Sequence, residues 1–448
     1  MDHHTQALRA FLVVDDYNKL ETEDHHTQAL RAFLDQAHSV YHAQQGLVQQ
    51  LKAAGFQPLQ EQETWQIAPG GRYYVTRGDA AVMAFRVPQG APTGFMMSAS
   101  HLDRPCFKVK ENGELTGTYT RLAVERYGGM ILSTWLDRPL SIAGRVAVQT
   151  EQGIRTQLVD IDQDLLLIPN VAIHMNRQVN DGYKWNPAVD LLPLLGGKEA
   201  AGRLEAMLEE QAGGKILGRD LYLYIRQKSS VWGVNQEYLS SAALDDLECA
   251  WACAQGFLEA ADSQAISVLC LFDSEEVGSG SVQGAGSTLL ADTLHRICQA
   301  GGWDLRQLLA QSFLVSADNA HALHPNHPEF SDAANAPVMG GGVVIKHNAS
   351  MSYCTDGVAA GLFRSICQRA EAAAQSYYNR ADLPGGSTLG HISLAHVSVP
   401  TVDIGLAQLA MHSSFETGAI SDIEALVKAM TALYSTALEV RGQEYILR

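Results

Sequence analysis

The chain has 448 residues, of which 46% are hydrophobic and 18% are charged. This composition can fill the cores of more than one domain and excludes a disordered or fibrous protein. The 32 basic and 49 acidic side chains give a formal net charge of −17, which argues against nucleic acid or an anionic membrane surface as a partner.

Targeting signals and cysteine usage indicate the compartment. We find no apolar run of membrane-spanning length and no basic-then-apolar secretory signal at the first residues. The seven cysteines include no CxxC pair, a pattern typical of reduced thiols rather than of a disulfide framework. We therefore expect a cytoplasmic globular protein.

The first segment contains an exact repeat. Residues 2–12 and residues 24–34 both read DHHTQALRAFL. One faithful copy is too short for a solenoid, which needs several imperfect units. We interpret residues 1–23 as a duplicated leader, artefactual or disordered, and exclude them from the fold.

The next elements are a helix and the strands of a sheet. The second copy runs into a helix that ends before Gly55, and residues 72–76 and 80–87 flank the turn signal Arg77-Gly78-Asp79. Residues 94–98 (GFMMS) predict a buried strand that leads to the polar segment 100–105.

Residues 106–226 have a pattern of short strands and turns, with strands predicted at 130–135, 141–149 and 220–225. Residues 190–213 interrupt them with a Gly-Gly turn and a short helix. We expect an inserted β-rich domain over 106–226.

After residue 243 helices and buried strands alternate. Helices are predicted near 246–260, 284–298, 355–374 and 422–441, and strands at 265–272, 312–316 and 401–404. Such alternation predicts an α/β fold in which helices cover a mixed sheet. Residues 24–105 plus 227–448 would form this domain, interrupted by the β-rich insertion.

Glu275 and Glu276 lie in DSEEVG, directly after the apolar strand at 265–272. Functional crevices in open α/β sheets lie outside the carboxyl ends of strands. Two adjacent carboxylates repel each other, and burying them is costly without a cation. A solvated acidic turn is the alternative for this pair taken alone.

Other predicted strand ends also carry possible metal ligands. His101 with Asp103 follows the GFMMS strand, and a histidine held by a carboxylate is a common metal-site pairing. The remaining candidates are Asp245, Asp318 and His412. Taken singly, each has an ordinary alternative, such as a helix cap for Asp245. Together they form a mixed nitrogen and oxygen set that suits zinc, manganese or cobalt.

Five segments in order, SHLDRP, LDDL, DSEEVGS, SADNAHALHPN and QLAMHS, resemble the aspartyl aminopeptidase family of metallopeptidases. The likeness runs from about residue 24 to the end of the chain. It implies an α/β catalytic domain of the zinc-exopeptidase type, interrupted by a β-rich dimerisation domain. It also implies a homo-oligomer, a tetrahedral dodecamer built from dimers.

The resemblance implies roles for the matching residues. Asp245 would bridge two divalent metal ions, with His101 and Asp318 completing one site and Glu276 and His412 the other. Asp103 would orient His101, and Glu275 would be the general base for a water that bridges the ions. Zinc is the expected metal, with manganese or cobalt as alternatives.

Substrate contacts are also implied by the resemblance. Lys346, in GGGVVIK, and Tyr353 match the family segment that contacts substrate, and His174 matches a histidine that reaches a neighbouring subunit's active site. Arg104 stands where the best-studied eukaryotic members usually carry serine, and residues 384–388 also depart from their pattern.

The leading hypothesis is a di-metal aminopeptidase that removes N-terminal residues from peptides, preferentially Asp or Glu. The same chemistry on neutral N-terminal residues or on acylated amino acids is the enzymatic alternative. A catalytically silent assembly or scaffold protein is the non-enzymatic one, although buried clustered carboxylates would destabilise it without a cation.

Overall fold

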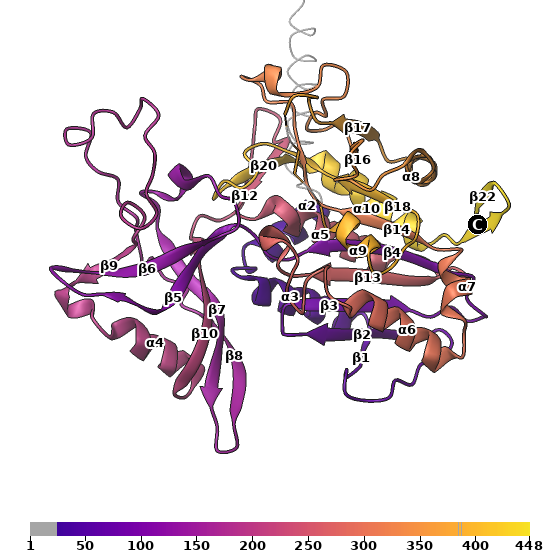
Figure 1. Cartoon of the computed structure of the whole chain (residues 1–448), viewed down its shortest axis with the longest axis horizontal. Helices are drawn as coiled ribbons and strands as arrows, with labels where there is room; N and C mark the ends of the chain where they lie inside the picture. Colours follow the sequence, from indigo (N-terminus) through magenta and orange to yellow (C-terminus); the bar gives the residue numbers. More distant parts are fainter. Residues whose placement is uncertain (1–24, 384, 387) are drawn as a thin grey trace, which may run out of the picture.

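A nine-stranded mixed sheet forms the centre of the larger lobe in the computed structural model, which describes residues 25–383, 385–386 and 388–448 (Figure 1). The expected leader at 1–23 lies outside these residues. In spatial order the strands are β1 (Gln57–Pro58), β2 (Arg72–Arg77), β3 (Ala81–Arg86), β13 (Ile266–Phe272), β4 (Phe95–His101), β14 (Phe313–Ala317), β18 (Thr401–Gly405), β16 (Val343–His347) and β17 (Ala374–Tyr378).

The middle of this sheet is parallel. β13, β4, β14 and β18 run in one direction, and β3 and β16 pair antiparallel to the two outer members. Every residue of β13 is buried, as expected for a strand with both faces covered. Val268 and Cys270 enter one hydrophobic cluster, while Leu269 enters the cluster on the opposite face.

Helices cover both faces of the sheet, as the alternating sequence pattern predicts. The larger hydrophobic cluster, on one face of the sheet, includes side chains from α2 (His25–Leu34), α3 (Val40–Ala53), α5 (Leu244–Glu259), α8 (Gly357–Arg369) and α10 (Ile420–Tyr434). The cluster on the opposite face includes side chains from α6 (Leu289–Gly301), α7 (Leu305–Leu309) and α9 (Leu389–Leu394). The α/β fold class is thereby confirmed.

A six-stranded antiparallel sheet forms the second lobe (Figure 1). Its strands are β8 (Ile154–Asp160), β7 (Leu140–Gln149), β10 (Ile216–Ile225), β5 (Cys106–Leu115), β6 (Tyr119–Tyr127) and β9 (Leu194–Gly197), with α4 (Arg203–Ala212) beside them. This lobe has a hydrophobic cluster of its own. A dimerisation domain over 106–226 stays a prediction.

Three smaller sheets complete the described chain. β11 (Ser230–Trp232), β12 (Tyr238–Ser241) and β20 (Glu416–Ala419) form one, β15 (Ala320–His321) pairs with β19 (Ala407–Gln408), and β21 (Leu438–Arg441) pairs with β22 (Glu444–Leu447). The β12–β20 pair sets Ser241 opposite Glu416. This pairing brings the start of α5 close to the segment that carries His412.

Two predicted elements are wrong. Residues 132–135 form a short 3-10 helix, η1 (Leu132–Trp135), instead of a strand, and Trp135 packs edge-on against Phe107 in the core. The last helix ends at Tyr434 rather than near 441, because Ser435 and Thr436 turn their hydroxyls back onto helix carbonyls and a hairpin follows.

No helix within the described ranges combines the length and the apolar character needed to cross a membrane.

Candidate metal centre

The carboxyl ends of three neighbouring parallel strands meet at one edge of the large sheet. His101 is the last residue of β4, and the register sets it opposite Phe272 at the end of β13. Glu275 and Glu276 follow in the short helix η3 (Glu275–Val277), and Asp318 follows β14 on the other side of β4. The strand order therefore explains why residues far apart in sequence lie together.

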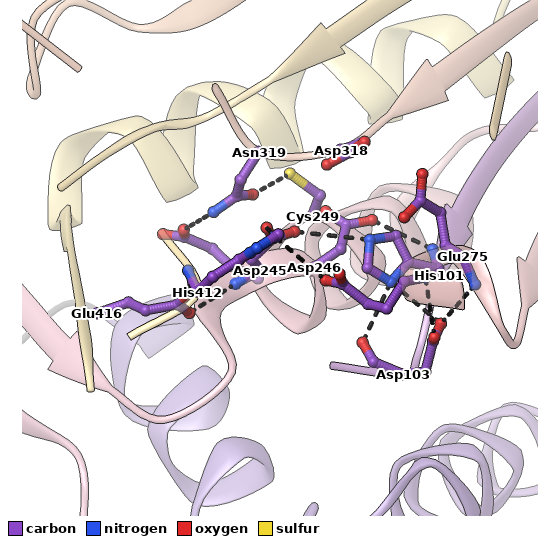
Figure 2. A network of polar contacts seen from close by, with 12 residues as sticks. His101, Asp103, Asp245, Asp246, Cys249, Glu275, Asp318, Asn319, His412 and Glu416 are labelled. Carbon is purple, nitrogen blue, oxygen red and sulfur yellow. Dashed lines mark hydrogen bonds and ion pairs between the residues drawn. The ribbon is translucent and has the colours of Figure 1, made fainter. Parts of the chain in front are cut away.

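Asp245 lies between two histidines (Figure 2). His101 Nε2 is 3.5 Å from Asp245 Oδ1, and His412 Nε2 is 3.4 Å from Asp245 Oδ2. Asp245 is 3% exposed, and its Oδ1 accepts no hydrogen bond. Each carboxylate oxygen thus faces a different imidazole, so Asp245 can belong to two groups of ligand atoms at once.

Both histidines are held through their other ring nitrogen. His101 Nδ1 lies 3.1 Å from the backbone oxygen of Asp103, and His412 Nδ1 bonds to the backbone oxygen of Gly129. A carbonyl oxygen only accepts, so each Nδ1 carries the proton and donates it. Each Nε2 is therefore the nitrogen that a metal ion would take in exchange for a proton, as in many metal-bound histidines.

Two groups of ligand atoms share Asp245. His101, Asp245 and Asp318 form one, Asp245, Glu276 and His412 form the other, and the ligand atoms within each group all lie within 4.8 Å of one another. A third group joins His101 to Glu275 and Glu276. The donor set and the unbonded Asp245 oxygen fit divalent ions such as zinc. The five residues expected as ligands all lie in the first two groups, and Glu275 joins them only in the third.

The electrostatics of the cluster also favour a cation. Burial raises the pKa of Asp318 and of Glu276, and it raises the pKa of Glu275 to about 7. Burial alone would lower the pKa of His412, but its hydrogen bond to Asp245 and the charge of Glu276 raise that pKa to about 10. Without a metal the site therefore holds protons, and a bound cation would replace them.

Asp103 contacts His101, the histidine that it is expected to orient. Its Oδ1 is 3.3 Å from His101 Nδ1 and 3.1 Å from the backbone nitrogen of Glu275, which donates to it. Its Oδ2 accepts from the backbone nitrogen of Glu276 at 3.2 Å. One carboxylate thus holds a histidine of one group and the backbone of the Glu275-Glu276 pair.

Glu416 is a site residue that the sequence did not reveal. It is buried, and it accepts hydrogen bonds from the backbone nitrogen of Asp245 at 3.1 Å and of His412 at 2.7 Å. Burial raises the pKa of Glu416 to about 8. Its position four residues after His412 was the only available signal, and that spacing alone does not identify a support for the ligands.

The three expected substrate contacts lie in different surroundings. Lys346 is buried on β16, where Nζ donates to the backbone oxygens of Asp318 at 2.7 Å and Asn319 at 3.2 Å. Its Nζ lies 5.2 Å from the centre of the Tyr353 ring, so these two residues adjoin the Asp318 side of the site. His174 is exposed, and within the described part of the chain no hydrogen bond or ion pair joins it to the metal-centre residues.

Arg104, the departure from the family pattern, uses its guanidinium to bond to backbone oxygens between two helices. Its guanidinium donates to the backbone oxygen of Ala37 at 2.8 Å and to that of His38. Arg104 thereby ties the loop between α2 and α3 to the segment that carries Asp103.

Comparison with known proteins identifies the family. The family model described as aminopeptidase I zinc metalloprotease (M18) matches residues 33–434. A probable M18 family aminopeptidase 2 of Clostridium novyi (strain NT) is 40% identical over 405 residues, which span 86% of this chain and 92% of that protein.

Solved structures agree with this assignment. A chain of the cryo-EM structure of the Ape4 and Nbr1 complex is 32% identical, with a TM-score of 0.88 over 91% of this chain and 85% of that one. The S. cerevisiae mApe1 dodecamer gives 25% identity and a TM-score of 0.79 over 91% of this chain and 95% of that one. The chain therefore belongs to the M18 family of zinc metalloaminopeptidases, enzymes that hydrolyse peptide bonds.

Proposed function

We propose that this aminopeptidase works with two divalent metal ions that share Asp245. His101 and Asp318 would complete one site, and Glu276 and His412 the other. The observation that carries the proposal is the division of the two Asp245 oxygens between the Nε2 atoms of His101 and His412, at 3.5 and 3.4 Å. We infer zinc as the metal, with manganese or cobalt as alternatives.

When bound at these residues, two such ions would supply Lewis acidity, which would lower the pKa of a nearby water and polarise the scissile carbonyl. The chain's own residues supply the proton transfer and the orientation. Glu275 takes a proton from the attacking water and gives it to the leaving amine. Burial raises the pKa of Glu275 to about 7, which suits a group that must both accept and donate a proton near neutral pH.

We infer a preference for acidic N-terminal residues from the cation beside the centre. A substrate carboxylate approaching a protein of net charge −17 needs local positive charge. Lys346 supplies it, with Nζ 3.7 Å from Asp318 Oδ2 and the Tyr353 ring alongside. Two of the three ammonium donors bond to backbone oxygens, which leaves one for a substrate.

The burial of Lys346 favours a second candidate. The residue is 2% exposed, and it already neutralises part of the carboxylate cluster. If the Lys346 ammonium only balances the charge of Asp318, no cation remains among the described residues of the site to bind an acidic side chain at the N-terminus of the substrate. The enzyme would then act by the same chemistry on neutral N-terminal residues.

We propose that activity requires an assembled homo-oligomer, a tetrahedral dodecamer built from dimers, with residues 106–226 as the dimerisation domain. The mApe1 relative is described as a dodecamer. His174 lies among exposed apolar side chains, with Ile173 48% and Met175 84% exposed, a surface that a second subunit would cover. His174 would then contact substrate in the neighbouring subunit. All seven cysteines are free, in keeping with a cytoplasmic location.

Steady-state hydrolysis of Asp, Glu, Leu and Ala p-nitroanilides tests the function. Each substrate is assayed with the metal-loaded protein, with a chelator, and after zinc, manganese or cobalt is restored. We expect chelator-sensitive turnover that is fastest for Asp and Glu. Turnover of Leu and Ala alone would overturn the acidic preference, and chelator-resistant turnover would overturn the metal mechanism.

A further inference from the structure

The end of β6 brings the six-stranded sheet into contact with the metal centre. Tyr127 is the last residue of β6, and Gly128 and Gly129 follow it. Each of these three consecutive residues contacts a different residue of the centre, although β6 itself belongs to the other lobe of the molecule (Figure 1). We call residues 127–129 the YGG segment.

Tyr127 contacts Asp103. Its hydroxyl donates to Asp103 Oδ2 at 2.8 Å, and this carboxylate also accepts from the backbone nitrogens of Glu275 and Glu276. Burial and the Asp103 charge raise the pKa of Tyr127, so the phenol stays protonated and remains a donor. The Tyr127 ring packs edge-on against Tyr222 of β10 at 5.6 Å, which fixes the hydroxyl relative to the six-stranded sheet.

The two glycines contact the second group of ligands. Gly128 has φ +77°, and a Cβ there would lie 3.1 Å from Glu276 Cβ and 3.3 Å from Glu276 Oε2. The backbone oxygen of Gly129 accepts the proton of His412 Nδ1. The close approach and the positive φ together require glycine at position 128.

We propose that the YGG segment is a positioning element for the metal centre. Tyr127 acts through Asp103 on His101 and on the backbone of Glu275 and Glu276. Because Gly128 has no Cβ, it leaves room for the side chain of Glu276. The backbone oxygen of Gly129 accepts the Nδ1 proton of His412 and so sets the tautomer of that ring. The inference rests on the metal roles proposed above and adds that the six-stranded sheet helps to build the metal site of its own chain.

Cobalt titration of the metal-free full-length protein, followed by visible absorption, tests this inference. Tyr127→Phe keeps the ring and removes the hydroxyl. We expect its affinity for Co²⁺ to fall roughly 10- to 100-fold, as is common when the group that holds a metal ligand is lost, and its absorption bands to change. Tyr224→Phe is the matched control, because it removes a hydroxyl that bonds to Asp160 in the same sheet.

A second pair of variants tests the glycine. Gly128→Ala adds a Cβ against Glu276, whereas Gly202→Ala adds one at a similar φ of +74° with nothing within 4 Å. We expect both to lower the unfolding temperature of the metal-free protein through backbone strain. Only Gly128→Ala is expected to weaken Co²⁺ binding or alter its spectrum.

The outcomes separate this inference from the proposed function. A wild-type protein that binds no Co²⁺ would overturn the metal roles and this inference with them. A wild-type protein that binds two ions, together with Tyr127→Phe and Gly128→Ala variants that match their controls in affinity and spectrum, would overturn the inference alone. Weaker binding and an altered spectrum confined to Tyr127→Phe and Gly128→Ala would support it.

Discussion

At the scale of single residues, the centre is a cluster of buried carboxylic acids that repel one another when they are ionised. Asp245, Glu276 and Asp318 each lie within the ligand groups, and burial raises the pKa of Glu276 and Asp318. The two histidines lower the pKa of Asp245 in spite of its burial. A divalent cation would relieve the same repulsion without protons, which is why metal binding at this site should release them.

Glu275→Gln tests the general base. The amide cannot accept the proton of the attacking water, so we expect kcat to fall roughly 10²- to 10⁴-fold. The amide is nearly isosteric and Glu275 is outside the two proposed sites, so the metal content should equal that of the wild type. Stopped assays and elemental analysis of the same preparation measure both quantities.

The exposed Glu151, in the turn between β7 and β8, gives the control for this variant. Glu151→Gln should keep the wild-type kcat. A Glu275→Gln variant that retains more than a tenth of the wild-type turnover would show that another group acts as the base.

Lys346→Met tests the acidic preference. The thioether fills most of the space of the lysine stem but removes the ammonium beside Asp318. We expect kcat/KM for the Asp substrate to fall roughly 10- to 100-fold, equivalent to the about 1.5–3 kcal/mol of a charged hydrogen bond. The value for the Ala substrate should change less.

Lys428→Met removes a lysine from the exposed side of α10 and should leave both substrates unaffected. Equal losses for the Asp and Ala substrates in Lys346→Met would assign the lysine to support of Asp318 instead of to substrate selection.

The proposed ligands could be predicted from sequence because acids and histidines stand near predicted strand ends and a helix start, and because the segments that carry them resemble a known family. Glu416, Tyr127 and Gly129 could not, because they act through contacts made only after folding. A backbone oxygen such as that of Gly129 has no side-chain signature at all. Its partner lies 283 residues away in the sequence.

At the scale of helices and strands, β4, β13 and β14 determine the site, and their apolar runs made them easy to predict. β16 and β17 were not predicted, since glycines and polar residues precede and interrupt their short apolar stretches. The 3-10 helix at 132–135 was mistaken for a strand because Trp135 enters the core from a segment that makes no ladder bonds. Short irregular elements of this kind depend on tertiary packing more than on local pattern.

The crossing of α5 and α10 requires glycine at 256. A Cβ there would lie 2.5 Å from Met430 Cβ and 2.8 Å from the backbone nitrogen of Thr431. We therefore expect Gly256→Ala to overpack the interface and to lower the free energy of unfolding by about 1–3 kcal/mol. Chemical denaturation followed by circular dichroism measures it.

Gly361, within α8, provides the opposite case because a Cβ there meets nothing within 4 Å. Gly361→Ala should raise stability by about 0.5–1 kcal/mol, since alanine restricts the unfolded chain and suits a helix. Equal effects of the two substitutions would contradict the close approach of α5 and α10.

At the scale of the whole molecule, the exposed loop with His174 is the feature that a single subunit leaves unexplained. Its apolar neighbours are exposed, and it belongs to the lobe that also supplies the YGG segment. The six-stranded sheet would thus serve two metal centres: its own through residues 127–129, and a neighbour's through His174. Sequence pattern alone could not assign either contact, because both depend on how the lobes and subunits are placed.

Mixed assemblies test the role of His174. His174→Ala keeps its metal centre but lacks the histidine that its neighbour needs, and Glu275→Gln keeps His174 but lacks the general base. Each variant should therefore be inactive or nearly so when expressed alone. Co-expression of the two should restore part of the wild-type activity, because a Glu275→Gln subunit donates its His174 to the centre of its partner. Full activity of His174→Ala, or no recovery in verified mixed oligomers, would contradict the shared site.

The most direct measurement is the metal content of wild-type and Asp245→Asn protein after removal of metal and re-equilibration with zinc. Asn keeps the shape of the side chain but loses the charge and one carboxylate oxygen. The division of the Asp245 oxygens between His101 and His412 predicts two zinc ions per wild-type chain and loss of both from the variant, with the unfolding temperature of the metal-free proteins similar. A wild-type chain that binds a single ion, or an Asp245→Asn chain that still binds two with unchanged affinity, would contradict a shared aspartate at the centre.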